Sequence, residues 1–221
     1  MKLWLLFDFD GTIADSIEEL FNLINGMAPR FGYQPITRER FETLRDLPLN
    51  KACSELQVPF YKLGTAIPVL LKELHQFIPR LRTYPGINEM LDKLREIGVN
   101  LALISSNSKE NLDAFLKHNS LNHFSWVEGT GGVLFKHAQI ARLIKKHALS
   151  SAKVIYVGDE VRDITAARKC GIQVISVNWG LHSAKHLAVN TPDYQVDTPD
   201  QVSEIVLDIL KTSSFVDTNQ I

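Results

Sequence analysis

The chain has 221 residues, of which 45% are hydrophobic and 22% are charged, and its formal net charge is -1. This composition is typical of a globular protein with one sizeable core and room for a smaller second module, and it excludes a largely disordered chain. A charge balance this close to neutral gives no indication of a nucleic-acid partner. The two cysteines, Cys53 and Cys170, lie far apart without metal-ligand spacing, which favours reduced thiols in a cytoplasmic protein over a disulfide framework.

The first apolar run, Leu3 to Phe7, does not alternate and therefore predicts a buried strand that is covered on both faces. It leads directly into Asp8-Phe9-Asp10-Gly11-Thr12. Carboxylates are rarely buried unless they are paired or bound to a metal, so we expect the two acids at this strand end to meet a cation. No later run approaches the roughly 20 apolar residues that cross a bilayer, and no membrane association is expected.

Residues 15–81 hold helical patterns without a convincing strand. Ser16-x-x-Glu19 resembles a capping box, and an apolar stripe at helical spacing accompanies it, formed by Ile17, Leu20, Phe21 and Ile24. Further helices are expected over residues 37–45, 50–56 and 61–77, with prolines between them. An all-helical block placed directly after the first strand is expected to form a lid over the strand ends.

From Arg82 onward, strand-like runs alternate with amphipathic helices, which is the pattern of βαβ units and a parallel sheet. The expected strands are 99–104, 154–157, 174–177 and 194–196, and the expected helices are 86–97, a segment around 139–146 and a last helix that opens at Thr198-Pro199. The prediction is an α/β fold, with a Rossmann-like parallel sheet core flanked by helices and an inserted all-helical cap. The core domain would comprise residues 1–14 and 82–213, the cap domain 15–81, and a C-terminal tail 214–221.

Three of the expected strands lead into residues that can do chemistry: Asp8, the segment Ser105-Ser106-Asn107, and Asp159. Ligands of open parallel sheets bind outside the carboxyl ends of the strands, so these separate segments should converge on one site. Together with Asp10 and Asp163, the two strand-end acids would make a strongly negative pocket. A hard divalent cation would relieve that repulsion, and oxygen ligands favour Mg²⁺.

These motifs resemble those of phosphatases in the haloacid dehalogenase superfamily. The matching pieces, in chain order, are Asp8-x-Asp10-Gly11-Thr12, Ser105, Lys136 and Gly158-Asp159-Glu160-x-x-Asp163. Each motif alone is permissive, but the four together are specific and span nearly the whole chain. The helical insert is similar to the cap of the subgroup that includes phosphoglycolate phosphatases. Ser105 stands where many relatives carry threonine, a departure that keeps the hydroxyl.

The resemblance implies a role for each phosphate-facing position. Asp8 would attack phosphorus as a carboxylate nucleophile and form an aspartyl phosphate, and Asp10 would act as general acid and base. Ser105 and Lys136 would bind the oxygens of the transferring phosphoryl group, the first by a hydrogen bond and the second by charge. A helix N-terminus near Ser108 would add amide donors.

The resemblance also implies a metal site. Asp8 and Asp159 would offer side-chain oxygens to Mg²⁺ and Asp10 its backbone carbonyl, while Asp163 would orient these ligands from a second layer. Glu160 is equally compatible with contact to a metal-bound water and with a solvated loop position. On the substrate side, the expected lining residues are Ser106 and Asn107.

The expected function is Mg²⁺-dependent hydrolysis of a small phosphorylated metabolite by a cytoplasmic monomer or weak homodimer. A dehalogenase of the same fold has no need of an acid at position 10, so Asp10 favours a phosphate substrate. Two alternatives stay open, namely a phosphosugar mutase and a binding or regulatory protein that has lost catalysis. Substrate choice is expected to lie in the cap, where Arg38, Arg45 and Lys51 either meet an anionic group or are simply solvated.

Overall fold

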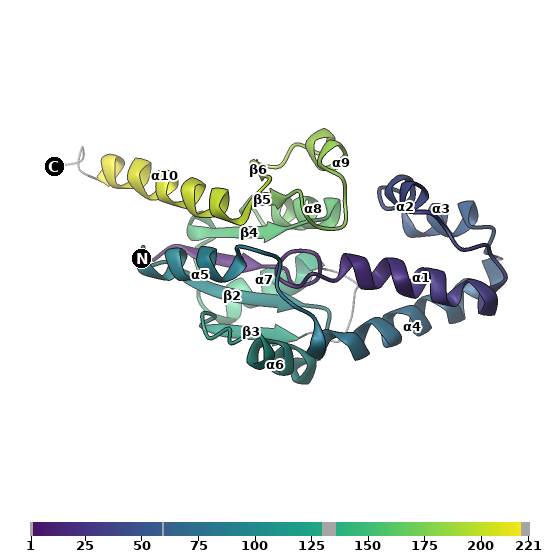
Figure 1. The fold of residues 1–221 in the computed structure, drawn as a ribbon. Helices are drawn as coiled ribbons and strands as arrows, with labels where there is room; N and C mark the ends of the chain where they lie inside the picture. Colours follow the sequence, from purple (N-terminus) through teal and green to yellow (C-terminus); the bar gives the residue numbers. More distant parts are fainter. Residues whose placement is uncertain (1, 59, 130–135, 218–221) are drawn as a thin grey trace.

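A six-stranded sheet forms the centre of the molecule in the computed structural model, which describes residues 2–58, 60–129 and 136–217. Helices cover both faces of this sheet (Figure 1). All neighbouring strands are parallel, in the order β3-β2-β1-β4-β5-β6, which is the predicted Rossmann-like arrangement. The strands are β1 (Trp4–Phe7), β2 (Asn100–Ser105), β3 (Trp126–Gly129), β4 (Val154–Gly158), β5 (Gln173–Val177) and β6 (Tyr194–Val196).

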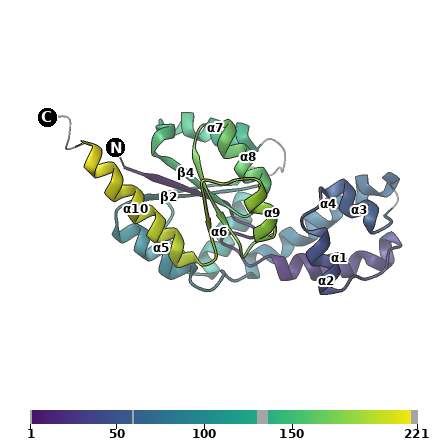
Figure 2. The same cartoon turned by 90° about the horizontal axis from the view of Figure 1, so that it is seen from above.

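Two groups of helices sandwich the sheet, with α7, α8 and α9 against one face and α5, α6 and α10 against the other (Figure 2). These flanking helices are α5 (Ile87–Glu96), α6 (Lys109–His118), α7 (Lys136–Lys146), α8 (Val161–Lys169), α9 (Ala184–Val189) and α10 (Pro199–Asp217). There are also two short 3-10 helices: η1 (Ile78–Arg80) lies before α5 in the chain, and η2 (Ser151–Lys153) directly precedes β4.

Strand β1 lies in the middle of the sheet and is buried from both sides. Leu5 and Phe7 pack into the cluster that includes α5, α6 and α10, whereas Leu6 packs into the cluster on the other face. All three side chains are fully buried. This position explains why the first apolar run does not alternate, because both faces of a central parallel strand meet helices.

Helices α1 to α4, which we call the helical block, lie beyond the carboxyl ends of the strands (Figure 1). They are α1 (Ile17–Phe31), α2 (Arg38–Leu44), α3 (Leu49–Glu55) and α4 (Phe60–Phe77). The chain enters and leaves the block at adjacent points, because the Asp15 N–H donates to the Arg82 carbonyl at 2.9 Å. The position is that expected of a lid, and the division into core and cap domains stays a prediction.

Three details differ from the sequence expectations. Strand β3 was missed because four half-buried residues at the sheet edge are too short for a periodic signal. The prediction of a capping box at Ser16 is wrong, because the Ser16 Oγ accepts a hydrogen bond from the Gly11 N–H at 3.1 Å and does not cap α1. Helix α10 continues to Asp217 because no glycine or proline interrupts residues 211–217, so residues 214–217 of the expected tail are helical. The tail as a separate segment stays a prediction, and residues 218–221 lie outside the described residues.

None of the helices in the described ranges combines the length and the apolar character that a membrane span requires.

Candidate active site

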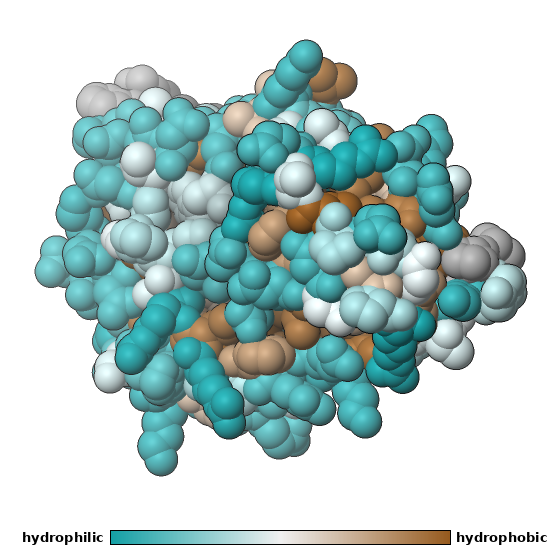
Figure 3. Space-filling view, turned by 45° about the vertical axis from the view of Figure 1, so that its right-hand side comes forward, coloured by the Kyte–Doolittle hydropathy of each residue, from teal (hydrophilic) through white to brown (hydrophobic). Residues whose placement is uncertain are grey.

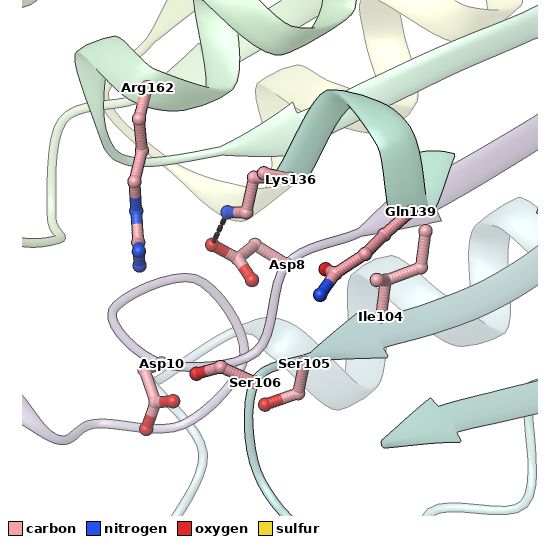
Figure 4. Close-up of a pocket in the computed structure, with 8 residues that line it drawn as sticks. All are labelled: Asp8, Asp10, Ile104, Ser105, Ser106, Lys136, Gln139 and Arg162. Atoms are coloured by element: carbon pink, nitrogen blue, oxygen red, sulfur yellow. Dashed lines mark hydrogen bonds and ion pairs between the residues drawn. The ribbon is translucent and has the colours of Figure 1, made fainter. Parts of the chain in front are cut away.

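The three chemistry-bearing strand ends meet in the middle of the sheet. Strand β1 pairs with β2 on one side and β4 on the other, with Phe7 opposite both Leu103 and Val157. Asp8 therefore emerges between Ser105 at the end of β2 and the loop that follows β4, and its N–H donates to the Val157 carbonyl at 2.8 Å. Asp8 and Ser105 both line one pocket, on opposite sides of it (Figure 4). The predicted convergence at the carboxyl edge is confirmed.

Lys136 begins helix α7 and extends its ammonium group between two buried acids. Its Nζ donates to Asp8 Oδ2 at 2.5 Å and also to Asp163 Oδ1 (Figure 4 shows the first bond). Burial by itself lowers the pKa of Lys136, but the carboxylates of Asp163 and Asp8 together raise that pKa well above its ordinary value. The lysine is thus a fixed positive charge at the centre of the site.

Among the described residues, only one of the two carboxylate oxygens of Asp10 accepts a hydrogen bond. Asn107 Nδ2 donates to Asp10 Oδ2 at 3.0 Å, and no hydrogen-bond partner among the described residues reaches the buried Oδ1. Burial, followed by repulsion from Asp8, raises the pKa of Asp10 to about 7. A carboxyl group with such a pKa can both give and take a proton near neutral pH. Asn107 thus contacts this acid, and its expected place on the substrate side stays a prediction.

Three buried carboxylates form a group that could hold a metal ion: Asp8, Asp159 and Asp163 offer oxygens that all lie within 4.8 Å of one another. Burial and mutual repulsion raise the pKa of Asp8 and that of Asp159. An all-oxygen set of acids with this repulsion fits a hard divalent cation. Asp163, which was expected in a second layer, thus offers an oxygen beside those of Asp8 and Asp159. The Asp10 side chain was not expected to bind the ion, and its backbone carbonyl as a ligand stays a prediction.

Asp163 and Asp159 are both anchored by neighbouring donors. Asp163 accepts from Lys136 and, through Oδ2, from the Glu160 N–H at 2.9 Å, which ties the first turn of α8 to the site. Asp159 accepts from Thr12 Oγ1 at 2.8 Å and from the Leu181 N–H at 2.7 Å. Such bonds fix where the carboxylate oxygens lie. Whether Asp163 orients the other ligands or binds the ion itself stays a prediction.

Two glycines allow the loops to close around Asp159. Gly11 has a φ of 72°, and a Cβ at this position would overlap the Asp159 carboxylate. A Cβ at Gly180 would overlap Asp159 and the Gly11 carbonyl. Any side chain at either position would therefore push the acid out of place, which is why the DxDGT-type turn needs glycine.

The pocket beside Asp8 contains two residues that the sequence reasoning missed, Arg162 and Gln139. Its lining residues are Asp8, Asp10, Ile104, Ser105, Ser106, Lys136, Gln139 and Arg162 (Figure 4). The sequence feature that could have indicated Arg162 is its position as a lone cation inside an acidic motif. Gln139 could have been found because it lies three residues after Lys136, on the same face of one helix.

Arg162 carries its charge into the pocket while bound to Glu160, with Nε donating to Glu160 Oε1 at 2.8 Å. Burial alone lowers the pKa of Arg162, but Glu160, Asp8 and Asp163 raise it further than burial lowers it. On the opposite wall, Ser105 Oγ accepts from the Asn107 N–H at 3.0 Å, so its hydroxyl is positioned by the loop that follows β2. The pocket thus combines an acid pair, two cations and two serine hydroxyls.

A family model described as haloacid dehalogenase-like hydrolase matches residues 5–177. A phosphoglycolate phosphatase from Synechococcus elongatus is 31% identical over 208 residues, covering 94% of this chain and 98% of that protein. A haloacid dehalogenase-like family protein from Streptococcus pneumoniae is similar in structure, with a TM-score of 0.78, 21% identity, and coverage of 93% of this chain and 98% of that chain. A protein from Clostridium acetobutylicum described as a predicted phosphatase also has a TM-score of 0.78, at 22% identity, over 94% of this chain and 99% of that chain.

Proposed function

The chain belongs to the haloacid dehalogenase-like hydrolase family, and we propose that it is a phosphatase that cleaves a small-molecule phosphomonoester through a phosphorylated Asp8. One observation carries this proposal: a buried carboxylate at the end of the central strand lies 2.5 Å from a fixed lysine ammonium. An acid with a pKa of about 7, Asp10, lines the same pocket. A nucleophile, a cation for the phosphoryl oxygens and a proton donor in one pocket are the parts that phosphoryl transfer requires.

In the first proposed step, an Asp8 carboxylate oxygen attacks phosphorus while the bond from phosphorus to the ester oxygen breaks. Protonated Asp10 gives its proton to the leaving oxygen, so the alcohol departs neutral. In the second step, Asp10 takes a proton from water as that water attacks phosphorus, and the bond to Asp8 breaks to release phosphate. Lys136 and the Ser105 hydroxyl hold the phosphoryl oxygens throughout both steps.

Mg²⁺ is part of the proposal, because the oxygens of Asp8, Asp159 and Asp163 make a set that fits a hard cation. When bound, the ion would neutralise charge on the phosphoryl group and on the acids. Arg162 would add a further positive charge at the mouth of the pocket. A small phosphorylated metabolite as the partner, and a cytoplasmic location, belong to the same proposal.

The proposed function is tested with an aryl phosphate assay on the full chain. We expect Mg²⁺-dependent release of phosphate, loss of at least about 99% of the rate after treatment with EDTA, and recovery when Mg²⁺ is added back, because the acids of the site repel a phosphate dianion without the cation. A panel of phosphoglycolate, sugar phosphates and nucleotides then ranks substrates by kcat/KM. A rate that survives full removal of metal would contradict the metal role, and no phosphate release from any compound would contradict the function.

A second prediction concerns the orientation of Asp10. Removing the amide in Asn107→Ala frees the acid to turn, and we expect kcat to fall by about 10- to 100-fold with KM nearly unchanged, because proton transfer needs a positioned donor. The matched control is Asn122→Ala, which removes an exposed amide that accepts from Arg95 at 3.2 Å, outside the lining of the catalytic pocket. An equal loss in both variants, or a change confined to KM, would show that Asn107 does not position Asp10.

A further inference from the structure

A second, larger cavity opens from the catalytic pocket into the helical block. Its volume is about 550 Å³, and Asp10, Ser106 and Arg162 line both this cavity and the smaller pocket beside Asp8. A substrate whose phosphoryl group lies at Asp8 would therefore place its leaving group in the larger space. Pockets that hold small molecules have volumes of about 300 to 1,000 Å³, so the cavity has room for far more than a two-carbon acid.

Apolar side chains from all four helices of the block line this cavity. The stripe of Ile17, Leu20 and Ile24 on α1 faces into it, and Phe41 of α2 and Leu70 of α4 contribute further walls. The three α1 residues of the stripe remain partly exposed instead of forming a closed core. In the space-filling view, hydrophobic surface emerges between hydrophilic side chains on the face that carries the block (Figure 3). Mostly apolar walls and a volume of this size are typical of pockets that hold small molecules, which favours an apolar occupant.

The arginine of the block that was a candidate for an anionic substrate group is already engaged. Arg45 lines the cavity, but its guanidinium donates to the Leu181 carbonyl and, at 2.6 Å, to the Gly180 carbonyl, and it pairs with Glu42 at 2.7 Å. Its contacts therefore join the block to the loop after β5. Arginine bound in this way has few donors left for a carboxylate.

The other two candidates do not contribute to the cavity. Arg38 pairs with Glu18 and stacks over the Phe21 ring, with its guanidinium carbon 4.0 Å from the ring centroid. Lys51 is exposed, and neither Arg38 nor Lys51 is among the described residues that line the cavity.

The remaining basic groups along the wall add little positive charge. Burial lowers the pKa of His75 and the pKa of His182, which favours their neutral forms. Arg162 stands at the catalytic end and is paired with Glu160. Within the described part of the chain, the apolar depth of the cavity thus offers no unengaged cation for a second anionic group.

We propose that this cavity receives the apolar body of the leaving alcohol, so that the preferred substrates are phosphomonoesters of hydrophobic alcohols or phenols and not phosphorylated small acids. This inference rests on the proposed function and narrows its substrate class. The reason is a matching of surfaces: the phosphoryl group meets Lys136 and the acid cluster, and the hydrocarbon meets the walls of the helical block. Each methylene moved from water into such an environment adds to transition-state binding.

The inference is tested with a ladder of n-alkyl phosphates, from ethyl to hexyl, and with phosphoglycolate, all at saturating Mg²⁺. We expect kcat/KM to rise about two- to fourfold for each added methylene, with hexyl phosphate at least about tenfold better than phosphoglycolate. If the alkyl phosphates are hydrolysed but kcat/KM does not change with chain length, the inference is overturned and the proposed function is left intact. A preference for phosphoglycolate over hexyl phosphate would also overturn it.

Filling the cavity with a larger side chain should weaken binding of long alkyl phosphates and leave binding of short ones nearly unchanged. Ala52→Phe on α3 and Ala66→Phe on α4 each place a ring in the cavity, and we expect KM for hexyl phosphate to rise about tenfold while KM for ethyl phosphate stays within about twofold. Ala114→Phe makes the same change on the exposed side of α6 and serves as the control. Equal effects on both esters, or no effect from any variant that folds, would count against the cavity as the binding site.

Binding of non-hydrolysable n-alkylphosphonates separates the two proposals. Calorimetry with Mg²⁺ should give a Kd that falls by about two- to fourfold for each methylene, even for a chain that does not turn over. If no ester is hydrolysed but the phosphonates bind with this dependence, the proposed function fails and the substrate class falls with it, whereas the cavity remains a binding site for apolar chains. If hydrolysis proceeds but phosphonate affinity does not depend on chain length, the cavity inference alone fails.

Discussion

Replacing Asp8 with asparagine is expected to reduce kcat by at least about 10⁴-fold, because the amide has nearly the shape of the carboxylate but no nucleophilic oxygen anion. The fold should tolerate the change. Burial already penalises the charged form of Asp8, as the raised pKa of this group indicates, and the amide oxygen can still accept from Lys136. We therefore expect the melting temperature of Asp8→Asn to stay within a few degrees of the parent.

The loss of the intermediate should accompany the loss of rate. Acid quenching of the parent during turnover should trap a phosphorylated chain that mass spectrometry detects and hydroxylamine cleaves, as expected of an acyl phosphate, whereas Asp8→Asn should give none. The control is Asp113→Asn on α6, which makes the same chemical change at an exposed acid paired with Lys109. A phosphorylated chain or a near-normal rate in Asp8→Asn would show that another group attacks phosphorus.

The position of Asp8 could be predicted from the sequence because the signal is strong at every level. Five apolar residues without alternation marked a central strand, and the ends of parallel strands meet at one edge. The same logic brought Ser105 and Asp159 to the site, since β2 and β4 flank β1. By contrast, β3 stayed hidden because an edge strand of four residues has no periodic pattern.

Contacts between distant segments could not be predicted in the same way. The sequence placed Asn107 on the substrate side but did not indicate that its amide donates to Asp10, a residue 97 positions away. Arg45 was expected either to meet an anionic group or to be solvated, yet it donates to carbonyl groups of residues 180 and 181. Which partner a polar side chain binds depends on loop geometry, and residue type alone does not predict that geometry.

The apolar stripe of α1 shows a related limit. Helical periodicity correctly predicted the helix, but it did not indicate what the hydrophobic face of the helix meets. In the structure, Ile17, Leu20 and Ile24 face a cavity that shares lining residues with the catalytic pocket. A hydrophobic pattern indicates that a face avoids water, but it does not distinguish packing against protein from packing against a ligand.

Replacing Lys136 with methionine is expected to affect both activity and stability. The ammonium group is the shared partner of Asp8 and Asp163, and all three side chains are buried or nearly so. Methionine of similar length leaves these acids without their cation, and breaking a buried ion pair on one side costs about 3 to 5 kcal/mol. The melting temperature should fall by about 10 °C, and kcat/KM should fall by about 10³-fold because a phosphoryl-binding charge is lost.

Two further measurements divide the structural part of this effect from the catalytic part. Addition of Mg²⁺ should restore much of the lost melting temperature, since a divalent cation at Asp8, Asp159 and Asp163 supplies the missing positive charge. The double variant Lys136→Met/Asp163→Asn removes a charge from each partner and should also recover stability, because a buried pair that is replaced on both sides leaves less uncompensated charge. Neither change should restore kcat/KM, since neither returns the lysine to the phosphoryl group.

The control for Lys136→Met is Lys145→Met on the same helix, where the side chain is exposed and a change within about 0.5 kcal/mol is expected. A Lys136→Met chain that melts like the parent would mean that Asp8 and Asp163 do not need the lysine as a partner for stability, and the structural role assigned to Lys136 would be wrong. Recovery of activity together with stability in the double variant would mean that the lysine only offsets Asp163. Stability that returns while kcat/KM stays low would place Lys136 on the substrate phosphate as well as on the acids.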